Sequence, residues 1–291
     1  MSEGNPRKRT DRMPEPFLDV RVHDLTDERG LSGLCVGYER GNWRDTQLVD
    51  HAMEWLPEFS LSHSEREGIS SGNSVQLLRK AAKVVYKSDK FQSRGEFGEL
   101  FLHIAVRQVF GSEPAISKIY YKSADNDTVK GFDAVHVVEG DEGLELWLGE
   151  AKFYNDISRA IRDVVAELEE HTRTDYLRTE FALIGNKIDD SWKHAEALKD
   201  LISGNTSLDE VFKRACIPIL LTYDSDVVAA HTLCSEDYIR QFEEEIRKHH
   251  KTFSMKGLPS DVRLHLFLMP LKSKKELVEM LDGKLKTWQS I

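Results

Sequence analysis

The chain has 291 residues, of which 40% are hydrophobic and 31% charged, and its formal net charge is −10 at pH 7. This apolar fraction supports a packed core, and the length fits one large α/β domain or two modest ones. No apolar run reaches the roughly 20 residues of a membrane helix, and the polar start lacks the apolar stretch of a secretion signal. Cys35, Cys216 and Cys234 have neither zinc-site nor paired spacing, so we expect a reduced, cytoplasmic protein without a membrane partner.

The part of the chain before residue 90 is predicted to be mainly helical. Residues 31–38 read as a short strand, whereas 43–56 and 74–86 have apolar residues at helical spacing. We therefore expect an amino-terminal helical lobe over residues 1–90, with a disordered start and a possible surface for a partner. Residues 91–291 would form the second, chemically active unit.

Segment 95–110 is predicted to be a helix with acidic residues in its first turn. Its apolar residues have helical spacing, and Glu96, Glu99 and His103 form a neighbouring polar stripe. Acids in a first turn also complement the helix dipole, which leaves Glu96 open between that role and a role in a site. Because Glu99 is flanked by apolar residues, we favour Glu99 as the carboxylate that this helix presents to a site.

Two apolar segments, 129–138 and 144–152, are predicted to form an antiparallel hairpin around an acidic, glycine-containing turn. Counting outward from the turn gives arms of almost equal length, so Asp133 and Glu150 should lie nearly opposite on strands about 4.8 Å apart. Alternate side chains of a strand share a face, so Glu150 and Lys152 should point the same way. The hairpin thus gathers two carboxylates and one ammonium.

This gathering of charges predicts a metal site. Two carboxylates so close repel unless a cation lies between them, and Mg²⁺ prefers one or two carboxylates together with waters and phosphate oxygens. We expect Glu99, Asp133 and Glu150 to bind Mg²⁺, or Mn²⁺ in its place, and Lys152 to support an attacking water. Acid-x-Lys spacing alone is not specific, because Asp282-Gly283-Lys284 also has it, in a helical pattern without a partner acid on a neighbouring strand.

After the hairpin the hydrophobic pattern alternates between helices and strands. Helices are predicted near 156–172, 191–203, 207–215, 236–250 and 274–288, and strands at 181–184, 217–223 and 262–271. With a further strand near 117–122, this alternation places the chain in the α/β class. Arg159 and Arg162 lie i, i+3 on the first of these helices, where they either touch backbone phosphates or form a solvated face.

A helix with Glu99, then a strand with Asp133, then a strand with Glu150-x-Lys152 resembles the PD-(D/E)xK nuclease superfamily. The resemblance implies a restriction-endonuclease-like core, with a central mixed sheet flanked by helices, and cleavage of DNA with Mg²⁺. Two departures stand out. Phe132 replaces the usual proline before the first acid, and residues 155–162 lack the glutamine-and-tyrosine motif of recombination-type relatives. Endonuclease and exonuclease action both stay open.

Longer stretches, from about Leu31 onward, resemble HamA, the nuclease subunits of Hachiman antiphage defence systems. The stretches are residues 77–82, 86, 90–91, 94–100, 149–154 and 217–224. This resemblance implies a DNA-degrading effector that is held by a partner helicase, HamB.

The net charge of −10 runs against simple DNA binding, because affinity for phosphates comes from Lys and Arg. Basic residues do cluster at Arg7-Lys8-Arg9 and in 118–122, and a helicase partner would reduce the need for a basic surface. A second class of function stays open, a catalytically inactive nuclease-fold module that binds a helicase or nucleic acid. The three acids and the lysine favour the nuclease, because a structural sheet gains nothing from burying uncompensated charges together.

Overall fold

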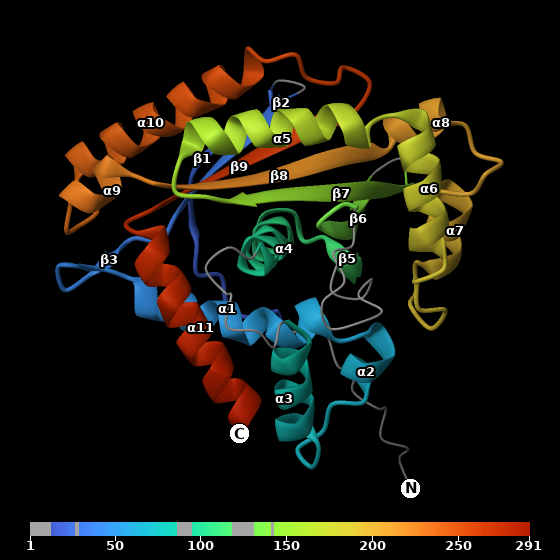
Figure 1. The fold of residues 1–291 in the computed structure, drawn as a ribbon, viewed down its shortest axis with the longest axis horizontal. Coiled ribbons are helices and arrows are strands. Elements are labelled where there is room, and N and C mark those ends of the chain that lie inside the picture. Colours follow the sequence, from blue (N-terminus) through green and yellow to red (C-terminus); the bar gives the residue numbers. More distant parts are fainter. Residues whose placement is uncertain (1–12, 27–28, 86–94, 118–130, 141–142) are drawn as a thin grey trace, which may run out of the picture.

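A mixed sheet forms the centre of the molecule (Figure 1). The computed structural model describes residues 13–26, 29–85, 95–117, 131–140 and 143–291, and within these ranges the sheet has seven strands. They are β1 (Asp19–Asp24), β2 (Arg29–Cys35), β5 (Glu113–Ser117), β6 (Ala134–Gly140), β7 (Gly143–Phe153), β8 (Ala215–Asp224) and β9 (Arg263–Leu271). Their order across the sheet is β1-β2-β9-β8-β7-β6-β5.

The middle of this sheet is parallel and both of its ends are antiparallel. Strands β2, β9, β8 and β7 run parallel, whereas β1 pairs antiparallel with β2, and β5, β6 and β7 pair antiparallel in turn. Nearly every residue of β8 and β9 is buried, as expected of parallel strands that are covered on both faces. The carboxyl ends of β7, β8 and β9 therefore meet at one edge of the sheet.

Helices cover both faces of the sheet (Figure 1). One face carries α5 (Ile157–His171) and α10 (Glu236–Ser254), and the other carries α4 (Glu96–Phe110). Below α4 lies α1 (Asp45–Ser60), which packs with α3 (Ser74–Val85) and α11 (Lys274–Ser290). The other elements are β3 (Tyr38–Glu39), β4 (Asn42–Trp43), α2 (His63–Glu67), α6 (Thr174–Gly185), α7 (Ala195–Leu201), α8 (Leu208–Lys213) and α9 (Asp226–Ala230). The α/β class with a mixed central sheet flanked by helices is confirmed.

Two glycines let α4 lie directly on β7. A Cβ atom at Gly98 of α4 would lie 2.8 Å from the Cβ atom of Phe153, and one at Gly149 of β7 would lie 2.7 Å from Leu102 Cδ2. Both separations are well inside van der Waals contact, so neither position accepts a larger side chain without a shift. The first turns of α4 are thereby fixed against the last residues of β7.

The amino-terminal segment contributes more than the predicted helical lobe. Strands β1 and β2, which precede residue 90, extend the same sheet as the later strands, and β2 pairs in parallel with β9. The predicted strand 31–38 overlaps β2, but β1 was not predicted. Only one residue of β1, Val22, is buried, so this edge strand carries little of the alternating pattern that marks a strand.

The predicted strand over 181–184 is wrong, because these residues belong to helix α6. Leu177, Phe181 and Ile184 are buried at i, i+4 and i+7, the spacing of one helical face. The predicted strand at 117–122 overlaps β5 only at Ser117, and the predicted strand at 129–138 overlaps β6 from Ala134 onward, while residues 131–133 are described but are not part of a strand. Residues 118–130 lie outside the described ranges, as do Arg7-Lys8-Arg9 and the start of the chain that was expected to be disordered.

The close approach of α4 and β7 predicts that Gly98→Ala lowers the free energy of unfolding by about 1–3 kcal/mol, because the new methyl group meets Phe153. Gly283→Ala in α11 is the matched control, since a Cβ atom there meets nothing within 4 Å and alanine should stabilise that helix by about 0.5–1 kcal/mol. Urea unfolding measures both changes. Equal effects of the two substitutions would contradict the close approach.

Candidate catalytic site

Strands β6 and β7 part at Asp133. Ala134 pairs with Gly149, and the N–H of Asp133 donates to the carbonyl oxygen of Gly149 over 2.8 Å. Beyond this point the Asp133 side chain continues the pairing, because its Oδ2 accepts the N–H of Ala151 at 2.8 Å. The carboxylate thus lies between the separating strands, at the level of Glu150, as the predicted register of the hairpin required.

Glu150 and Lys152 share the face of β7 that α5 covers. Glu150 Oε1 lies 2.5 Å from Nδ1 of His171, and the Lys152 ammonium donates to the carboxylate of Glu167. Both partners belong to α5. The residues on either side of this pair, Gly149 and Phe153, face the other way and contact α4. The predicted common orientation of Glu150 and Lys152 is confirmed.

A row of polar residues on α5, here called the α5 polar stripe, lies over this face of β7. The stripe has one residue every four positions: Arg159, Asp163, Glu167 and His171. Because residues four apart lie on the same side of a helix, the stripe presents a polar partner to each alternate residue of the strand. Its last two members contact Lys152 and Glu150.

Aromatic rings fix the His171 side chain beside Glu150. The Tyr176 ring stacks on the imidazole with centroids 4.4 Å apart and an interplanar angle of 15°. The Phe132 ring meets it edge-on at 5.2 Å. Sequence reasoning missed both His171 and Glu167. The sequence does contain a signal for these two residues, because they form a polar pair at i, i+4 on the helix that directly follows the motif. The apolar residue Leu168 lies on the same side of that helix and indicates that this side faces the sheet.

The site residues are strongly shielded from water and electrostatically linked. Glu150 is 1% exposed, and burial together with the charge of Asp133 raises the pKa of Glu150 to about 7, against the hydrogen bond from His171. Burial opposes the charge on Lys152, but Asp133, Glu150 and Glu167 outweigh it and raise the pKa of Lys152. Burial likewise opposes the charge on His171, and Glu150 outweighs it, so the pKa of His171 is raised. The ammonium and the imidazole therefore balance the carboxylates.

The predicted helix carboxylates belong to α4, which covers the opposite face of the sheet from α5. Glu96 and Glu99 are buried in the first turn of α4, and the Glu99 carboxylate lies beside Gly95 at the start of that helix. Within the described ranges, no three His, Cys, Asp or Glu side chains are arranged to hold a metal ion. The structure brings Asp133, Glu150 and Lys152 together, and the part of Glu99 in this group stays a prediction.

His103, the third member of the predicted stripe on α4, belongs to a different cluster. Its Nδ1 lies 3.2 Å from His136 Nε2, and its Nε2 lies 3.2 Å from Oε1 of Glu58. Ser112 Oγ lies 2.8 Å from the other ring nitrogen of His136. Arg107 also binds Glu58, with Nε 2.5 Å from Oε1. These buried contacts tie α1, α4 and β6 together behind the site.

Asp133 and Glu150 suit a divalent ion of the magnesium type. Their carboxylates are hard oxygen donors, and Mg²⁺ needs only one or two of them besides waters and phosphate oxygens. The contacts with Ala151 and His171 each use one oxygen of a carboxylate. The pKa of Glu150 is raised because burial and the charge of Asp133 disfavour its charged form, and a bound cation would favour that form.

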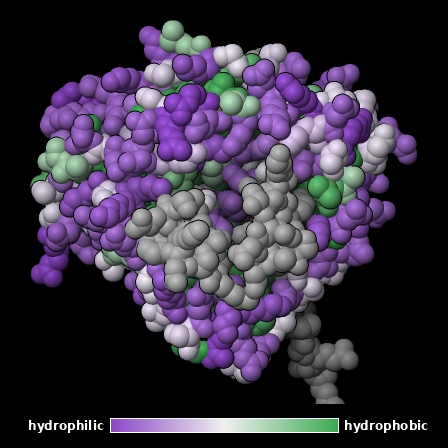
Figure 2. Space-filling model, viewed as in Figure 1, coloured by the Kyte–Doolittle hydropathy of each residue, from purple (hydrophilic) through white to green (hydrophobic). Residues whose placement is uncertain are grey.

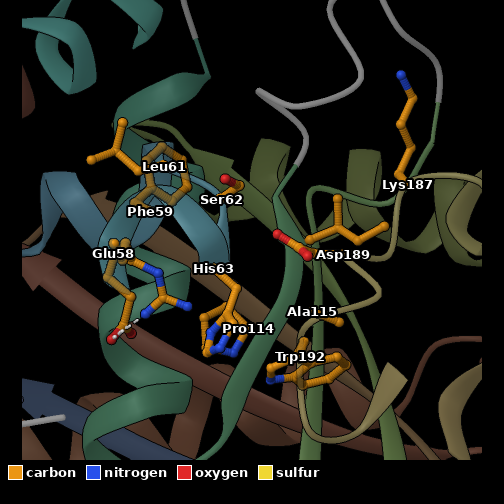
Figure 3. A pocket seen from close by; sticks show the side chains of 12 residues that line it. Glu58, Phe59, Leu61, Ser62, His63, Pro114, Ala115, Lys187, Asp189 and Trp192 are labelled. Atoms are coloured by element: carbon orange, nitrogen blue, oxygen red, sulfur yellow. Dashed lines mark hydrogen bonds and ion pairs between the residues drawn. The ribbon is translucent and has the colours of Figure 1, made fainter. Parts of the chain in front are cut away.

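The pocket in Figure 3 lies apart from these residues. Side chains from the end of α1, the edge strand β5 and the loop after α6 line it, among them Glu58, His63, Pro114, Asp189 and Trp192. Its volume of about 30 Å³ holds one or two water molecules. This pocket is too small for a substrate.

The fold and the site together define an α/β protein with a mixed central sheet and a buried Asp-Glu-Lys cluster at a strand end. The chain belongs to the HamA family of the Hachiman system, because the HamA family model matches residues 11–285. Membership of this family indicates a role in Hachiman antiphage defence. A search of curated proteins gave no match. None of the helices in the described ranges has both the length and the apolar character that a membrane crossing requires.

The raised pKa of Glu150 predicts a pH-dependent stability in the absence of metal. The folded state binds the proton of the Glu150 carboxyl group more tightly than the unfolded state does. The stabilisation from this proton is complete below pH 4.5, the ordinary pKa of a glutamate side chain, and is lost as the pH rises through about 7. The loss is on the order of 3 kcal/mol. Glu150→Gln should flatten the fall in unfolding free energy between pH 5 and 8, measured by urea unfolding in EDTA.

The exposed residue Glu279 supplies the control for this measurement. Glu279→Gln should keep the pH profile of the unaltered protein. A Glu150→Gln profile that overlays the control profile would show that Glu150 does not bind the proton in question.

Proposed function

We propose that the protein is a divalent-metal-dependent DNA nuclease with a PD-(D/E)xK core and acts as the effector of a Hachiman system. The observation that carries the proposal is the convergence of Asp133, Glu150 and Lys152 where β6 and β7 part, with side chains from two strands meeting in one buried place. Bringing like charges together away from water is costly. Such an arrangement is expected where the charges act on an ion and a substrate.

Each residue would have a separate role in phosphodiester hydrolysis. Asp133 and Glu150 would hold Mg²⁺ or Mn²⁺, and Glu99 would add a third carboxylate from α4. The bound ion supplies an acidified water and positive charge near the phosphate. Lys152 would exchange its contact with Glu167 for the attacking water or a phosphate oxygen, and so stabilise the negative charge that develops there.

His171 has a positioning role in this scheme. It holds one oxygen of the Glu150 carboxylate at 2.5 Å, and the rings of Tyr176 and Phe132 keep the imidazole in place. A carboxylate with a fixed orientation loses less entropy when it binds an ion. The other oxygen of Glu150 would then face the ion.

DNA is the proposed substrate, and a helicase subunit, HamB, is the proposed partner in a cytoplasmic complex. Family membership supports both, because it indicates a part in Hachiman defence. The net charge of −10 and the hydrophilic face in Figure 2 fit a protein that receives DNA from a partner. Control of cleavage by the helicase would also explain a motif that is buried in the isolated chain.

One observation favours a second function, an inactive nuclease-fold module that binds the helicase or nucleic acid. The described residues contain no ready three-member metal group, and Glu150 and Lys152 are both engaged by α5. A module of this kind would keep the motif only as part of its core. It would bind its partner without cutting DNA.

Plasmid cleavage distinguishes the two functions. With the helicase partner and Mg²⁺, the unaltered chain should cut plasmid DNA, and EDTA should abolish cutting. Lys152→Ala should reduce the rate by at least ~100-fold, because the charge that stabilises the reacting phosphate is lost. Gel electrophoresis of the plasmid over time measures the rate.

Lys284→Ala is the matched control, because Lys284 ends the other acid-x-Lys sequence and pairs with Asp50 on the surface. It should keep full activity. Urea unfolding of both variants separates a loss of chemistry from a loss of fold. An intact complex that leaves the plasmid uncut with Mg²⁺ and with Mn²⁺ would establish the inactive module instead.

A further inference from the structure

The edge of the sheet just beyond the motif carries positive charge from two helices. Strand β7 ends at Phe153, one residue after Lys152, and the parallel strands β8 and β9 end at the same edge. Helices α5 and α11 both begin there (Figure 1). Ligands of open α/β sheets bind at the carboxyl ends of parallel strands.

Two cations flank the end of β7 from its two faces. Arg159 of α5 lies over the Tyr154 ring, with Cζ 4.8 Å from the centroid, and Lys274 of α11 lies over the Phe153 ring, with Nζ 5.2 Å from the centroid. Since consecutive residues of a strand face opposite ways, the strand end lies between the two positive groups. Each ring holds its cation through a cation–π contact.

Hydrogen bonds between the connecting segments fix this arrangement. The N–H of Asp224, at the end of β8, donates to the carbonyl oxygen of Asn155 over 3.0 Å. The N–H of Lys274 donates to Asp224 Oδ1 over 2.5 Å. The starts of α5 and α11 are therefore both joined to the end of β8.

Three further cations extend this surface, which we call the basic edge. Its members are Arg159, Arg162, Lys272, Lys274 and Lys275. The side chains of Arg159 and Arg162 are 62% and 71% exposed, and Lys272 and Lys275 are also exposed. Five cations at one edge contrast with the excess of 50 acidic over 40 basic residues in the whole chain.

Neighbouring acids offset part of the positive charge and also shape the basic edge. Asp163 pairs with both Arg159 and Arg162, and Asp224 accepts the backbone N–H of Lys274. Asp156 accepts the N–H of Arg159 and caps α5, and Glu276 follows in the first turn of α11. These acids also fix the starts of the two helices, while the side chains of Arg159, Arg162, Lys272 and Lys275 remain largely exposed.

We propose that the basic edge is a binding surface for the sugar–phosphate backbone of DNA, which it guides to the Asp133–Glu150–Lys152 cluster. Arginine and lysine are the usual phosphate contacts of DNA-binding proteins. The surface adjoins Lys152 along β7, so a strand held there passes the end of the motif. This inference rests on the proposed nuclease function.

DNA binding without cleavage tests the basic edge. Every protein carries Lys152→Ala to prevent cutting, and fluorescence anisotropy measures the affinity for labelled single-stranded and duplex DNA of about 20 nucleotides, a length that can follow the surface and the adjoining motif. Lys272→Glu with Lys275→Glu should weaken binding at least ~10-fold and lower the slope of log affinity against log salt by about two. Arg159→Ala with Lys274→Ala should weaken it similarly.

The control reverses two exposed lysines elsewhere, Lys248→Glu with Lys251→Glu on α10. It makes the same change in net charge as the first edge variant and should alter the affinity by less than ~2-fold, because these lysines lie far from the proposed contacts. Equal losses in the control and the edge variants would overturn the proposal, and so would a parent protein that fails to bind either DNA at low salt.

Plasmid cleavage gives the independent outcome. If the unaltered complex cuts DNA but the edge variants bind as tightly as their parent, the nuclease function stands and the basic edge is wrong. If the complex cuts no DNA but the edge variants still lose affinity, the basic edge stands as a DNA-binding surface and the nuclease function fails.

Discussion

The hydrogen bond from the Ala151 N–H to the Asp133 carboxylate is the contact on which the candidate site depends. At this point the backbone of β6 leaves β7, and an N–H group within the sheet would otherwise lose its partner away from water, at a cost of about 1–3 kcal/mol. The side chain of Asp133 supplies that partner at 2.8 Å. The same contact therefore ends the pairing of the strands and fixes a carboxylate beside Glu150. Because the bond runs between the strands, its geometry follows from the hairpin register, in which Ala134 pairs with Gly149.

Two different kinds of packing hold the strands around this bond. On the α4 side the contact is steric, since Gly98 and Gly149 allow the helix and strand to touch. Behind α4, the cluster of Glu58, His103 and His136 joins this helix to α1 and β6. Burial opposes the charge of Glu58, yet the hydrogen bond from His103 and the charge of Arg107 hold the pKa of Glu58 at about 2. On the α5 side the contacts with Glu150 and Lys152 are polar. The packing against α4 is thus rigid, whereas the polar contacts with α5 can be replaced by other polar contacts.

The sequence was sufficient where the structure is local. The hairpin around Asp133 and Glu150 could be predicted from turn residues and strand alternation, because the paired residues are close in the chain. The pairing of β2 with β9 could not be predicted in this way. It joins residues more than 200 positions apart, and the backbone hydrogen bonds that form it do not determine the pattern of side chains along either strand. The apolar run at 181–184 was too short to distinguish strand from helix. His171 was missed because the rotation of α5 about its axis, set by the burial of Leu168 and its neighbours, decides which polar residues face β7.

The contrast between the two faces determines how the motif can become accessible. Glu150 and Lys152 are 1% and 8% exposed, so a phosphate can reach them only if some contact gives way. Separating α4 from β7 would open a void beside Phe153 and Leu102, and lost packing of this kind costs several kcal/mol. Replacing Glu167 by a phosphate at the Lys152 ammonium exchanges one charged hydrogen bond for another, with a small net change in free energy. Access therefore opens most readily along the α5 polar stripe, whose first member, Arg159, lies at the basic edge. If the proposed DNA binding holds, backbone phosphates bound there would already lie at the end of the helix whose contacts must be exchanged.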